Sequence, residues 1–353
     1  MKKPKIALII LNYNSRSHLP DLFSSLKSQT FKNFDTYLFD NASQDQSLTF
    51  VRQNYSWVKI VENKKNLGYG GGLYQAVEYL LQKKYDYFAF LNPDIRLAPD
   101  WLNQLFKTLR KDPKTAIVAP LSLSWDGKTV DCAGGSILNL AAGIFTGFLG
   151  GEKYQDIPSP FRLHPFPVFF GLTIATLFKK EVFLKYGSFD KDYFMYMVDN
   201  DLSWRLLLAG QKIICQPQAL CYHRGHGSQK TRSLELKITG EAETNLLATY
   251  YKNLSLLNFL LLLPILTLFR LFFSLIYLPL SPALGLVKIK GILHFYINLL
   301  TLKYQKKRRF AQNLRQISDK KVFLQNPTPI FAFSPILKLL FPHLNQLTKL
   351  TQK

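Results

Sequence analysis

The sequence predicts an α/β fold with a mainly parallel central sheet over residues 1–230, followed by a helical C-terminal region over residues 231–353. In the first 120 residues, short apolar runs alternate with stretches of helical spacing, a pattern typical of βαβ units and parallel sheets. The composition then changes, because residues 231–353 contain 17 Lys and Arg but only four Asp and Glu. This region carries +13 of the formal net charge of +22, which favours contact with polyanions.

Short apolar runs mark the expected strands, and the stretches between them have the spacing of amphipathic helices. The expected strands are Ile6–Leu11, Thr36–Phe39, Val58–Val61, Tyr87–Leu91, Ala116–Ala119, Phe170–Phe178 and Ile213–His223. The expected helices are Leu19–Gln29, Leu48–Asn54, Gly72–Lys83, Asp100–Lys111 and Leu202–Leu208. Residues 121–170 contain glycine pairs and several prolines and have no regular pattern.

Polar residues follow four of the expected strands. They are Asn12-Tyr13-Asn14, Asp40-Asn41, Asn63 and Asn92-Pro93-Asp94. The carboxyl ends of parallel strands share one edge of a sheet, and ligands of such sheets bind at that edge. The sequence therefore predicts a binding site there.

The overall composition indicates a folded protein long enough for two or three domains. Of the 353 residues, 47% are hydrophobic and 19% are charged, which excludes an intrinsically disordered chain. The three cysteines, Cys132, Cys215 and Cys221, have no metal or disulfide spacing, which indicates a reducing compartment. The first apolar run has only six residues before Asn12, so we expect a buried strand rather than a signal peptide.

The C-terminal region contains long apolar stretches beside basic residues. Arg270 is the only charged residue from Asn253 to Val287, and it separates two uncharged pieces of 17 residues that contain prolines. A spanning helix needs about 20 apolar residues, so each piece is marginal. Ile292–Leu302 is also apolar and runs into the basic cluster Lys303–Arg309. We expect a helical hairpin or in-plane helices at an anionic membrane surface. The alternative is packing against the N-terminal domain or a second subunit.

Two acidic motifs are candidates for chemistry. Asp94, in Asn92-Pro93-Asp94, can hold Mg²⁺ or Mn²⁺ against a diphosphate, although these residues are also ordinary in a strand-to-helix turn. Asp199-Asn200-Asp201 opens an expected helix, where capping alone can explain Asp201. The aromatic run just before it favours a general base whose pKa is raised by apolar walls.

Two loops are candidates for phosphate binding. Asn66–Gly72 is rich in glycine and precedes a helix, so its backbone can approach a phosphate, but it matches neither the dinucleotide fingerprint nor the P-loop. The segment Tyr222–Ser228 contains His223, Arg224 and His226 among glycines. This composition favours a loop that closes over phosphates with His223 as a metal ligand, and a purely structural histidine is the alternative.

Taken in order, these motifs resemble the inverting glycosyltransferases of family 2, and most of all their bacterial rhamnosyltransferase-like branch. The resemblance covers roughly residues 5–230. It rests on Ile10–Asn14, Asp40–Asp45, Asn66–Gly72, Asn92–Asp94 and Asp199–Arg205. Each motif is short, and their order and spacing make the resemblance specific.

The resemblance implies the nucleotide-diphospho-sugar transferase (GT-A) fold and a role for each matching residue. Tyr13 would lie against the nucleotide base, and Asp40 would hydrogen-bond it. The full set of implied nucleotide-sugar-binding residues is Asn12, Tyr13, Asn14, Asp40, Asn66, Gly68, Asn92 and Asp201. Asp94 and His223 would be ligands of a divalent metal, Mg²⁺ or Mn²⁺, and Asp199 would be the general base.

Two positions depart from the family pattern. Val198 stands where the family often has Glu, which puts the orientation or pKa of the base in doubt. Asn92 stands at the first carboxylate position of the metal motif, a replacement that weakens the expected metal affinity.

The resemblance also implies an activity and a location. The activity is transfer of a sugar, with rhamnose suggested by the branch, from a nucleotide-diphosphate donor to a hydroxyl of a glycan or polyprenyl-diphosphate-linked acceptor in cell-surface polysaccharide synthesis. We expect the enzyme at the cytoplasmic face of the cell membrane, against an anionic surface, without nucleic acid as a partner.

Other functions explain parts of the pattern. A polyprenyl-phosphate glycosyltransferase would use the lipid phosphate as acceptor, and a non-catalytic nucleotide-sugar-binding protein at the membrane would bind donors without turnover. A nucleic-acid-binding protein would explain the charge, but the basic residues lie beside apolar segments and no known motif is present. A dinucleotide-dependent oxidoreductase is excluded because the glycine-rich loop follows the third expected strand and lacks the fingerprint spacing.

Overall fold

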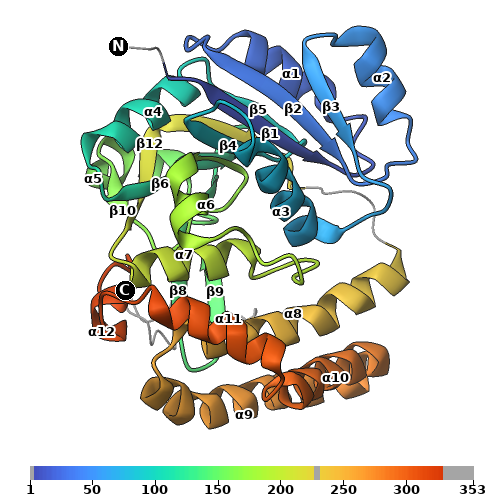
Figure 1. The fold of residues 1–353 in the computed structure, drawn as a ribbon, viewed down its shortest axis with the longest axis vertical. Helices are drawn as coiled ribbons and strands as arrows, with labels where there is room; N and C mark the ends of the chain where they lie inside the picture. Colours follow the sequence, from blue (N-terminus) through green and yellow to red (C-terminus); the bar gives the residue numbers. More distant parts are fainter. Residues whose placement is uncertain (1–3, 226–230, 329–353) are drawn as a thin grey trace, which may run out of the picture.

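The computed structural model describes residues 4–225 and 231–328, and a central sheet organises the first of these ranges (Figure 1). The sheet has the strand order β10-β12-β6-β11-β4-β1-β2-β3, with β5 beside β12 and β7 beside β6. Its strands are β1 (Ile6–Asn12), β2 (Phe34–Asp40), β3 (Val58–Glu62), β4 (Tyr87–Leu91), β5 (Ile95–Leu97), β6 (Thr115–Ser124), β7 (Val130–Cys132), β10 (Phe166–Pro167), β11 (Ala175–Lys179) and β12 (Lys212–His223). Strands β1 to β4 pair in parallel, as do β6 and β12, whereas β11 runs antiparallel to its neighbours β4 and β6.

Helices cover both faces of this sheet. They are α1 (Leu19–Lys27), α2 (Ser47–Asn54), α3 (Gly68–Leu81), α4 (Trp101–Lys111), α5 (Ser159–Leu163), α6 (Lys180–Tyr186) and α7 (Val198–Leu208). Strand β1 is buried along its whole length, and its side chains alternate between two cores. Ile6 and Leu8 pack in the core that contains residues of α1 and α4, while Ala7 and Ile9 pack in the core that contains residues of α3. A strand covered on both faces explains why this run is continuously apolar.

Several expected boundaries are wrong, and three of them bear on the site. The strand expected at Phe170–Phe178 begins only at Ala175, because the chain turns at Thr173 before it enters the sheet. Helix α3 begins at Gly68, so the later glycines lie in its first turns rather than in a loop. Helix α7 begins at Val198, which puts Asp199 inside its first turn.

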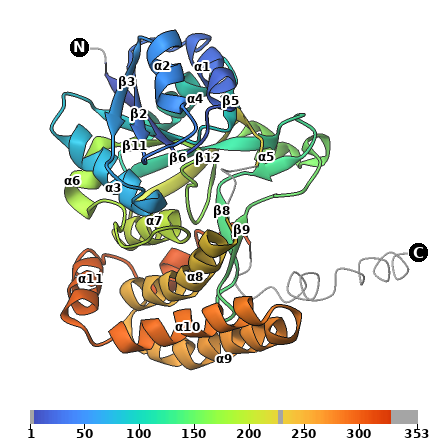
Figure 2. The same cartoon turned by 90° about the vertical axis from the view of Figure 1, so that its right-hand side faces the viewer.

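A hairpin from the irregular part of the sequence reaches the C-terminal helices (Figure 2). It consists of β8 (Gly135–Asn139) and β9 (Ile144–Gly147). Between these strands lies Gly143, at a positive φ of 65°, and a Cβ there would meet Leu246 and Leu266 side chains at under 3.0 Å. The hydroxyl of Tyr250 also donates to the Leu140 carbonyl at 2.7 Å. The hairpin therefore packs into the C-terminal helices.

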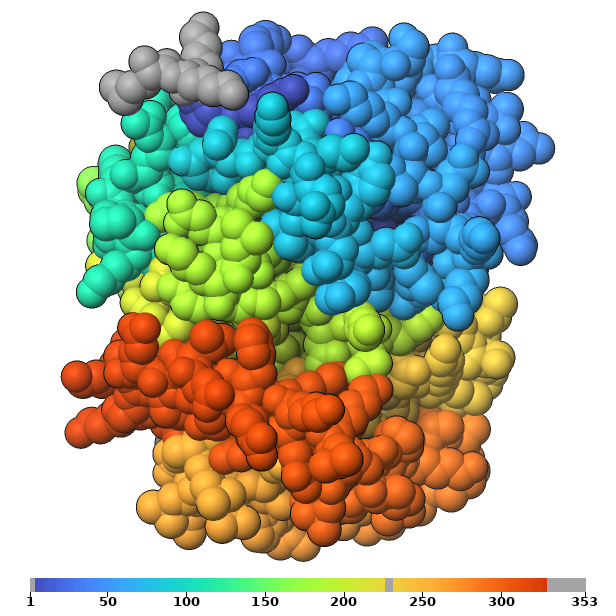
Figure 3. All heavy atoms as spheres, in the orientation of Figure 1, coloured from blue at the N-terminus to red at the C-terminus, as the bar shows by residue number. Residues whose placement is uncertain are grey.

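Five helices make up the described part of the C-terminal region, residues 231–328, and they form the end of the molecule opposite the N-terminal sheet (Figure 3). They are α8 (Arg232–Asn253), α9 (Leu256–Leu280), α10 (Pro282–Asn298), α11 (Leu302–Asn313) and α12 (Asp319–Phe323). Helix α9 runs through both Pro264 and Arg270, so the expected division into two marginal pieces is wrong. This helix of 25 residues contains an 18-residue stretch with a mean hydropathy of 2.4, so it is long and apolar enough to cross a membrane. The division of the chain into domains at residue 230 stays a prediction.

Arg270 does not break helix α9 because its charge is neutralised inside the protein. Its guanidinium donates two hydrogen bonds of 2.6 Å to the carboxylate of Glu243 on α8. Lys288 on α10 contacts the same carboxylate, which is fully buried. A bidentate Arg–carboxylate pair in a buried place satisfies the charge that the sequence alone leaves unexplained.

Candidate active site

A cavity of about 420 Å³ opens at the carboxyl edge of the parallel strands, where the sequence predicted a site. We call it the sheet-edge cavity, and its size is in the range of small-molecule sites. Its lining residues are Leu11, Tyr13, Ser15, His18, Asn41, Asn66, Gly68, Tyr69, Asn92, Pro93, Asp94, Phe194, Met195, Tyr196, His223, Gly225, Leu234 and Ile238. Six of the expected site residues line it, namely Tyr13, Asn66, Gly68, Asn92, Asp94 and His223.

Asp94 and His223 meet in this cavity although they are far apart in the sequence. The register that pairs β5 with β12 places His223 opposite Ile95, next to Asp94. The His223 Nε2 atom lies 3.3 Å from Asp94 Oδ2, and its Nδ1 atom lies 3.1 Å from Asp131 Oδ2. Burial lowers the pKa of His223, but hydrogen bonds to the two carboxylates outweigh it and raise the pKa to about 9. Burial raises the pKa of Asp94, but the hydrogen bond and charge of His223, together with a backbone hydrogen bond and the charge of His18, bring it below its ordinary value.

The Asp94–His223 pair has the chemistry of a divalent-metal site. A carboxylate oxygen and an imidazole nitrogen come together, and Asp131 would hold the other ring nitrogen as outer carboxylates do in metalloproteins. Among the residues that the structure describes, no group of three or more His, Cys, Asp or Glu side chains is arranged to hold a metal ion. The pair therefore fits a cation whose remaining ligands come from a diphosphate and water.

The expected base-binding residues Asn12, Asn14 and Asp40 lie behind the cavity wall. Both carboxylate oxygens of Asp40 are occupied, since Asn12 donates to Oδ1 at 2.7 Å and the Ser43 backbone N–H donates to Oδ2 at 2.8 Å. Asn14, at a positive φ of 50°, accepts from the Gln44 backbone N–H at 2.7 Å. These hydrogen bonds fix the loops after β1 and β2, which carry Tyr13 and Asn41 to the cavity, and the nucleotide contact of Asn12, Asn14 and Asp40 stays a prediction.

Asp199 lies beside the cavity and is connected to the cavity residue Tyr69 through the hydroxyl group of Thr173. It accepts a hydrogen bond of 2.7 Å from the Thr173 hydroxyl, which lies 2.6 Å from the hydroxyl of Tyr69, a cavity residue. Tyr69 lies 3.1 Å from the Asn92 side chain. Burial raises the pKa of Asp199 to about 7, against the lowering effect of the Thr173 hydrogen bonds. A carboxyl group that titrates near neutral pH is suited to act as a general base.

The glycines of the expected phosphate loop bring two segments of backbone together. The Tyr69 N–H donates to the Phe194 carbonyl, and the Gly70 N–H donates to the Tyr193 carbonyl at 3.1 Å. A Cβ on Gly70 would meet that carbonyl oxygen at 2.3 Å. The contact of helix α3 with residues 187–197 therefore requires glycine at this position, a reason that the sequence motif alone does not reveal.

Asp201 does not reach the sheet-edge cavity, although the sequence predicted a ligand contact. Its buried carboxylate lies 2.8 Å from Lys252 Nζ and 3.1 Å from Arg205, and it accepts from Asn253 at 3.0 Å. These partners come from α7 and α8, so Asp201 joins the two helices. Asp201 does not cap helix α7 either, because the start of this helix has no side-chain cap hydrogen bond.

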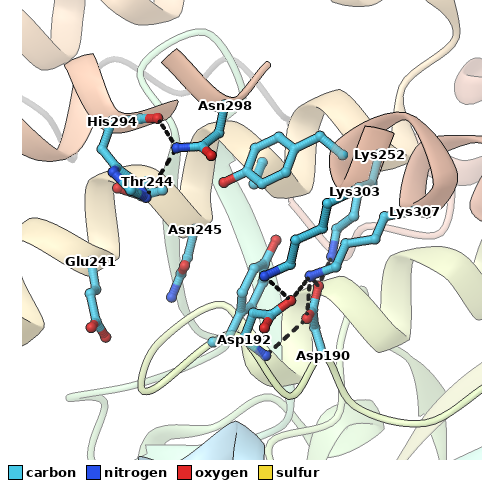
Figure 4. Close-up of a pocket in the computed structure, with 13 residues that line it drawn as sticks. Asp190, Asp192, Glu241, Thr244, Asn245, Lys252, His294, Asn298, Lys303 and Lys307 are labelled. Carbon is cyan, nitrogen blue, oxygen red and sulfur yellow. Dashed lines mark hydrogen bonds and ion pairs between the residues drawn. The ribbon is translucent and has the colours of Figure 1, made fainter. Parts of the chain in front are cut away.

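A second cavity of about 240 Å³ lies between helices α8, α10 and α11 and residues 187–197 (Figure 4). Its lysines are already paired with carboxylates. Asp190 contacts Lys252 at 2.8 Å and Lys307 at 2.6 Å, while Asp192 contacts Lys303 at 2.9 Å and Lys307 at 2.6 Å. We call these five residues the ion cluster. Because each of its three lysines already contacts a carboxylate, the cluster fastens helix α11 to residues 187–197.

Sequence reasoning missed several cavity residues. Tyr196 and Met197 both have positive φ, at 59° and 60°. This turn places the segment from Phe194 through Tyr196 at the rim of the cavity. The aromatic run was visible in the sequence, but its backbone conformation was not. Leu234 and Ile238 of α8 also line the cavity, so the C-terminal region contributes to the site. His226, in the expected closing loop, lies outside the described residues.

Comparison with known proteins gives a family match for the N-terminal part of the chain. Residues 7–130 match the family model described as Glycosyl transferase family 2. The chain is 26% identical over 238 residues to the N-acetylglucosaminyl-diphospho-decaprenol L-rhamnosyltransferase of Mycobacterium tuberculosis (strain CDC 1551 / Oshkosh), covering 63% of this chain and 77% of the relative.

Two solved structures resemble the fold. One is GalNAc-T7 with UDP, GalNAc and Mn²⁺, with a TM-score of 0.56 and 15% identity over 71% of this chain and 48% of that chain. The other is the mannosyltransferase PcManGT from Pyrobaculum calidifontis in complex with GDP-Man and Mn²⁺, with a TM-score of 0.51 and 15% identity over 92% and 88% of the two chains. These similarities confirm the expected GT-A fold.

Proposed function

We propose that this chain, whose residues 7–130 match the model of glycosyl transferase family 2, is a glycosyltransferase that transfers its sugar with inversion to a hydroxyl acceptor. One observation carries this proposal. Around a single cavity the fold gathers a metal-type pair, Asp94 and His223, and a carboxyl group, Asp199, whose pKa is about 7. Leaving-group stabilisation and proton removal are the two tasks of a direct displacement.

The sheet-edge cavity is the proposed site of the nucleotide-diphosphate sugar. Tyr13 offers an aromatic face for the base, and Asn66 and Asn92 offer polar contacts along the same wall. Asp94 and His223 would hold Mg²⁺ or Mn²⁺, and when bound this ion would supply positive charge against the diphosphate. Both solved relatives contain Mn²⁺ with a nucleotide or a nucleotide sugar, which supports this assignment.

Asp199 is the proposed general base. As the acceptor oxygen bonds to the anomeric carbon, the bond from that carbon to the diphosphate oxygen breaks and its electron pair leaves with the diphosphate. Asp199 takes the proton of the acceptor hydroxyl. Val198, which replaces the family's Glu, is buried and apolar, so it adds no charge beside Asp199. A single displacement of this kind inverts the anomeric configuration.

The proposed acceptor is a lipid-linked sugar of cell-surface polysaccharide synthesis, and the proposed donor sugar is rhamnose. The similarity to an L-rhamnosyltransferase that is named for a diphospho-decaprenol acceptor supports both. A polyprenyl-phosphate glycosyltransferase remains the second candidate, because residues of α8 line the cavity beside a long apolar helix. Offering free polyprenyl phosphate and the diphosphate-linked sugar in parallel assays separates the two.

The apolar helix supports a location at the membrane, on the cytoplasmic side where nucleotide sugars are supplied. The outward face of α9 is apolar, and Leu257, Leu261 and Leu268 are 68%, 61% and 67% exposed. Its one charge, Arg270, points inward to Glu243. Basic side chains of α11, including the exposed Lys306 and Arg309, lie on the next helix but one. An apolar face near cations fits an anionic bilayer surface.

The test of the proposed function is nucleotide release from UDP-, dTDP- and GDP-sugars with Mg²⁺ or Mn²⁺ and lipid-linked acceptors. We expect turnover of one donor by the wild type and its loss in Asp199→Asn, with nucleotide binding retained. Asp156→Asn is the matched control, because Asp156 is an exposed carboxylate in a short 3₁₀ helix. Binding without turnover across the panel would support the non-catalytic alternative, and equal turnover by Asp199→Asn would assign the base elsewhere.

A further inference from the structure

Asp199 is held by a side chain that the family motifs do not include. We propose that Thr173 is a positioning residue, and that with Tyr69 it forms a chain of hydroxyl groups that orients the Asp199 carboxylate and joins it to the Asn92-Pro93-Asp94 motif. This inference rests on the proposed function, because it gives Thr173 a role only if Asp199 is the base. Neither Thr173 nor Tyr69 belongs to the expected site residues.

The geometry of the chain is tight at each link. Thr173 is 2% exposed, and its Oγ1 donates to Asp199 Oδ1 at 2.7 Å. The Tyr69 hydroxyl lies 2.6 Å from the same Oγ1 and 3.1 Å from Asn92 Oδ1. The chain thus links the first turn of α3, the turn before β11, the first turn of α7 and the loop after β4. The distances of 2.6 and 2.7 Å are those of well-formed O–H···O bonds, and 3.1 Å lies in the range of an N–H···O bond.

Proton counting fixes the direction of the chain. A hydroxyl has one proton, so Thr173 can donate to Asp199 only while it accepts from Tyr69. Tyr69 then has no proton for Asn92 Oδ1, and the chain is complete when the Asn92 amide turns its Nδ2 group toward Tyr69. The oxygen and nitrogen of an amide are exchanged by such a rotation at little steric cost. Every link then donates toward the carboxylate, which favours its ionised form.

A purely structural role is the simpler explanation for a buried threonine, and the neighbouring Thr176 illustrates it. The Thr176 hydroxyl donates to the Leu172 carbonyl, a bond within its own segment. Thr173 instead bonds two side chains that are 104 and 26 residues away in the sequence. Its single hydroxyl therefore connects Asp199, the proposed base, with Tyr69, which contacts the Asn92-Pro93-Asp94 motif of the proposed donor site.

Tyr69 is the titratable group that faces Asp199. Burial raises the pKa of its hydroxyl, and the nearby charge of Asp199 and, more weakly, that of Asp94 raise it further. Tyr69 therefore stays protonated over the whole range in which Asp199 titrates. The hydroxyl groups of Thr173 and Tyr69 therefore act only as hydrogen-bonding groups, and in this pH range only the Asp199 carboxyl group among the three changes its protonation state.

The decisive variant is Thr173→Val, which keeps the shape and removes the hydroxyl. Losing a donor to the ionised carboxylate raises the pKa of Asp199, so the acid limb of the kcat/KM profile moves to higher pH. We expect kcat to fall roughly tenfold or more at pH 7, as for loss of a hydrogen bond to a charged group, with KM for the donor little changed. Thr173→Ser restores the hydroxyl and should return both the rate and the pH profile toward the wild type.

Thr36→Val is the matched control. Thr36 is a buried threonine of β2 whose hydroxyl has no hydrogen-bond partner within residues 4–225 and 231–328, so its replacement should leave the pH profile unchanged. The inference is overturned if Thr173→Val keeps the wild-type profile, or if its loss of activity is not rescued by serine and leaves the acid limb in place.

A readout without turnover separates this inference from the proposed function. In protein labelled with ¹³C at aspartate carboxyl carbons, the resonance absent from Asp199→Asn reports Asp199. Thr173→Val should move the titration of that resonance to higher pH, whether or not a donor has been found. An unchanged titration contradicts the hydroxyl chain, whereas a shifted titration in an enzyme that turns over no nucleotide sugar contradicts only the proposed function.

Discussion

At the scale of single residues, Asp199 differs from Asp94, Asp131 and Asp201, each of which has a basic partner. Asp94 and Asp131 share His223, and Asp201 has Lys252 and Arg205. In residues 4–225 and 231–328, no Lys, Arg or His forms an ion pair with Asp199, and hydroxyl and backbone groups are its partners. Burial therefore dominates and raises the pKa of Asp199, whereas His223 contributes to lowering the pKa values of Asp94 and Asp131.

This raised pKa predicts that Asp199 costs the protein stability at high pH. Because the folded-state pKa is about 7 and the ordinary value is 3.8, the folded protein binds the proton more tightly than the unfolded chain. The stability that this proton provides is present at low pH and is lost as pH rises from about 4 to about 7. Asp199→Asn does not titrate, so we expect its gain in Tm over the wild type to be larger at pH 8 than at pH 5. Thermal unfolding at both pH values measures this, and an equal difference would argue against a raised pKa.

At the scale of elements, the contact of helix α3 with residues 187–197 depends on Gly70. A Cβ at this position would lie 2.3 Å from the Tyr193 carbonyl oxygen and 2.8 Å from that of Asp190. Both are backbone atoms, so relief requires moving the segment that carries Met195 and Tyr196 to the cavity. We expect Gly70→Ala to lower the free energy of unfolding by about 1–3 kcal/mol, as overpacking does, and to weaken nucleotide binding.

Gly71→Ala is the control for this change. Its nearest contact would be the Leu67 Cβ at 3.1 Å, and the Lys191 carbonyl oxygen would lie 3.5 Å away. Denaturant unfolding and nucleotide titration of the two variants give the comparison. Equal effects would mean that helix propensity, and not the contact with residues 187–197, decides the outcome.

The ion cluster joins helix α11 to residues 187–197, the segment that precedes Asp199. Lys307 contacts both Asp190 and Asp192, and Lys252 remains beside Asp190 when Lys307 is removed. We expect Lys307→Met to destabilise the protein by about 1–2 kcal/mol, less than for loss of a sole buried partner. Lys306→Met is the control, because Lys306 is exposed on the same helix. Similar unfolding midpoints for the two variants would show that the cluster contributes little.

At the scale of the whole molecule, the exposed face of α9 predicts membrane binding. Leu261→Asp with Leu268→Asp places two charges on this face, where both leucines are more than 60% exposed, so folding should be retained. We expect co-sedimentation with vesicles that contain anionic lipid to fall strongly. Each leucine side chain that enters the bilayer contributes about 1.5–3 kcal/mol to binding, and aspartate removes this contribution. Leu163→Asp with Leu184→Asp is the control, because these exposed leucines lie away from α9. Equal sedimentation of both variants would contradict the proposed surface.

The parts of the fold that the sequence predicts are those that depend on local pattern. Strand β1 and the motif after β4 were located because burial on both faces and turn chemistry leave a mark within a few residues. The partners of Thr173 and the pairing of Arg270 with Glu243 were not predictable, because they join residues that lie 26 to 104 positions apart in the sequence. The contact of Asp201 with Lys252 of α8 could not be predicted for the same reason, because the two residues lie far apart in the sequence. The roles predicted for the site residues that line the cavity stay predictions, and the activity assays test them.

The central claim is a single displacement with Asp199 as the base, and the anomeric configuration of the first product tests it most directly. The measurement is an NMR spectrum of the product formed from a donor of known configuration, recorded early in the reaction. The displacement predicts a product whose anomeric configuration is opposite to that of the donor. A product that retains the donor configuration would require two displacements or a different mechanism, and would contradict the role given to Asp199.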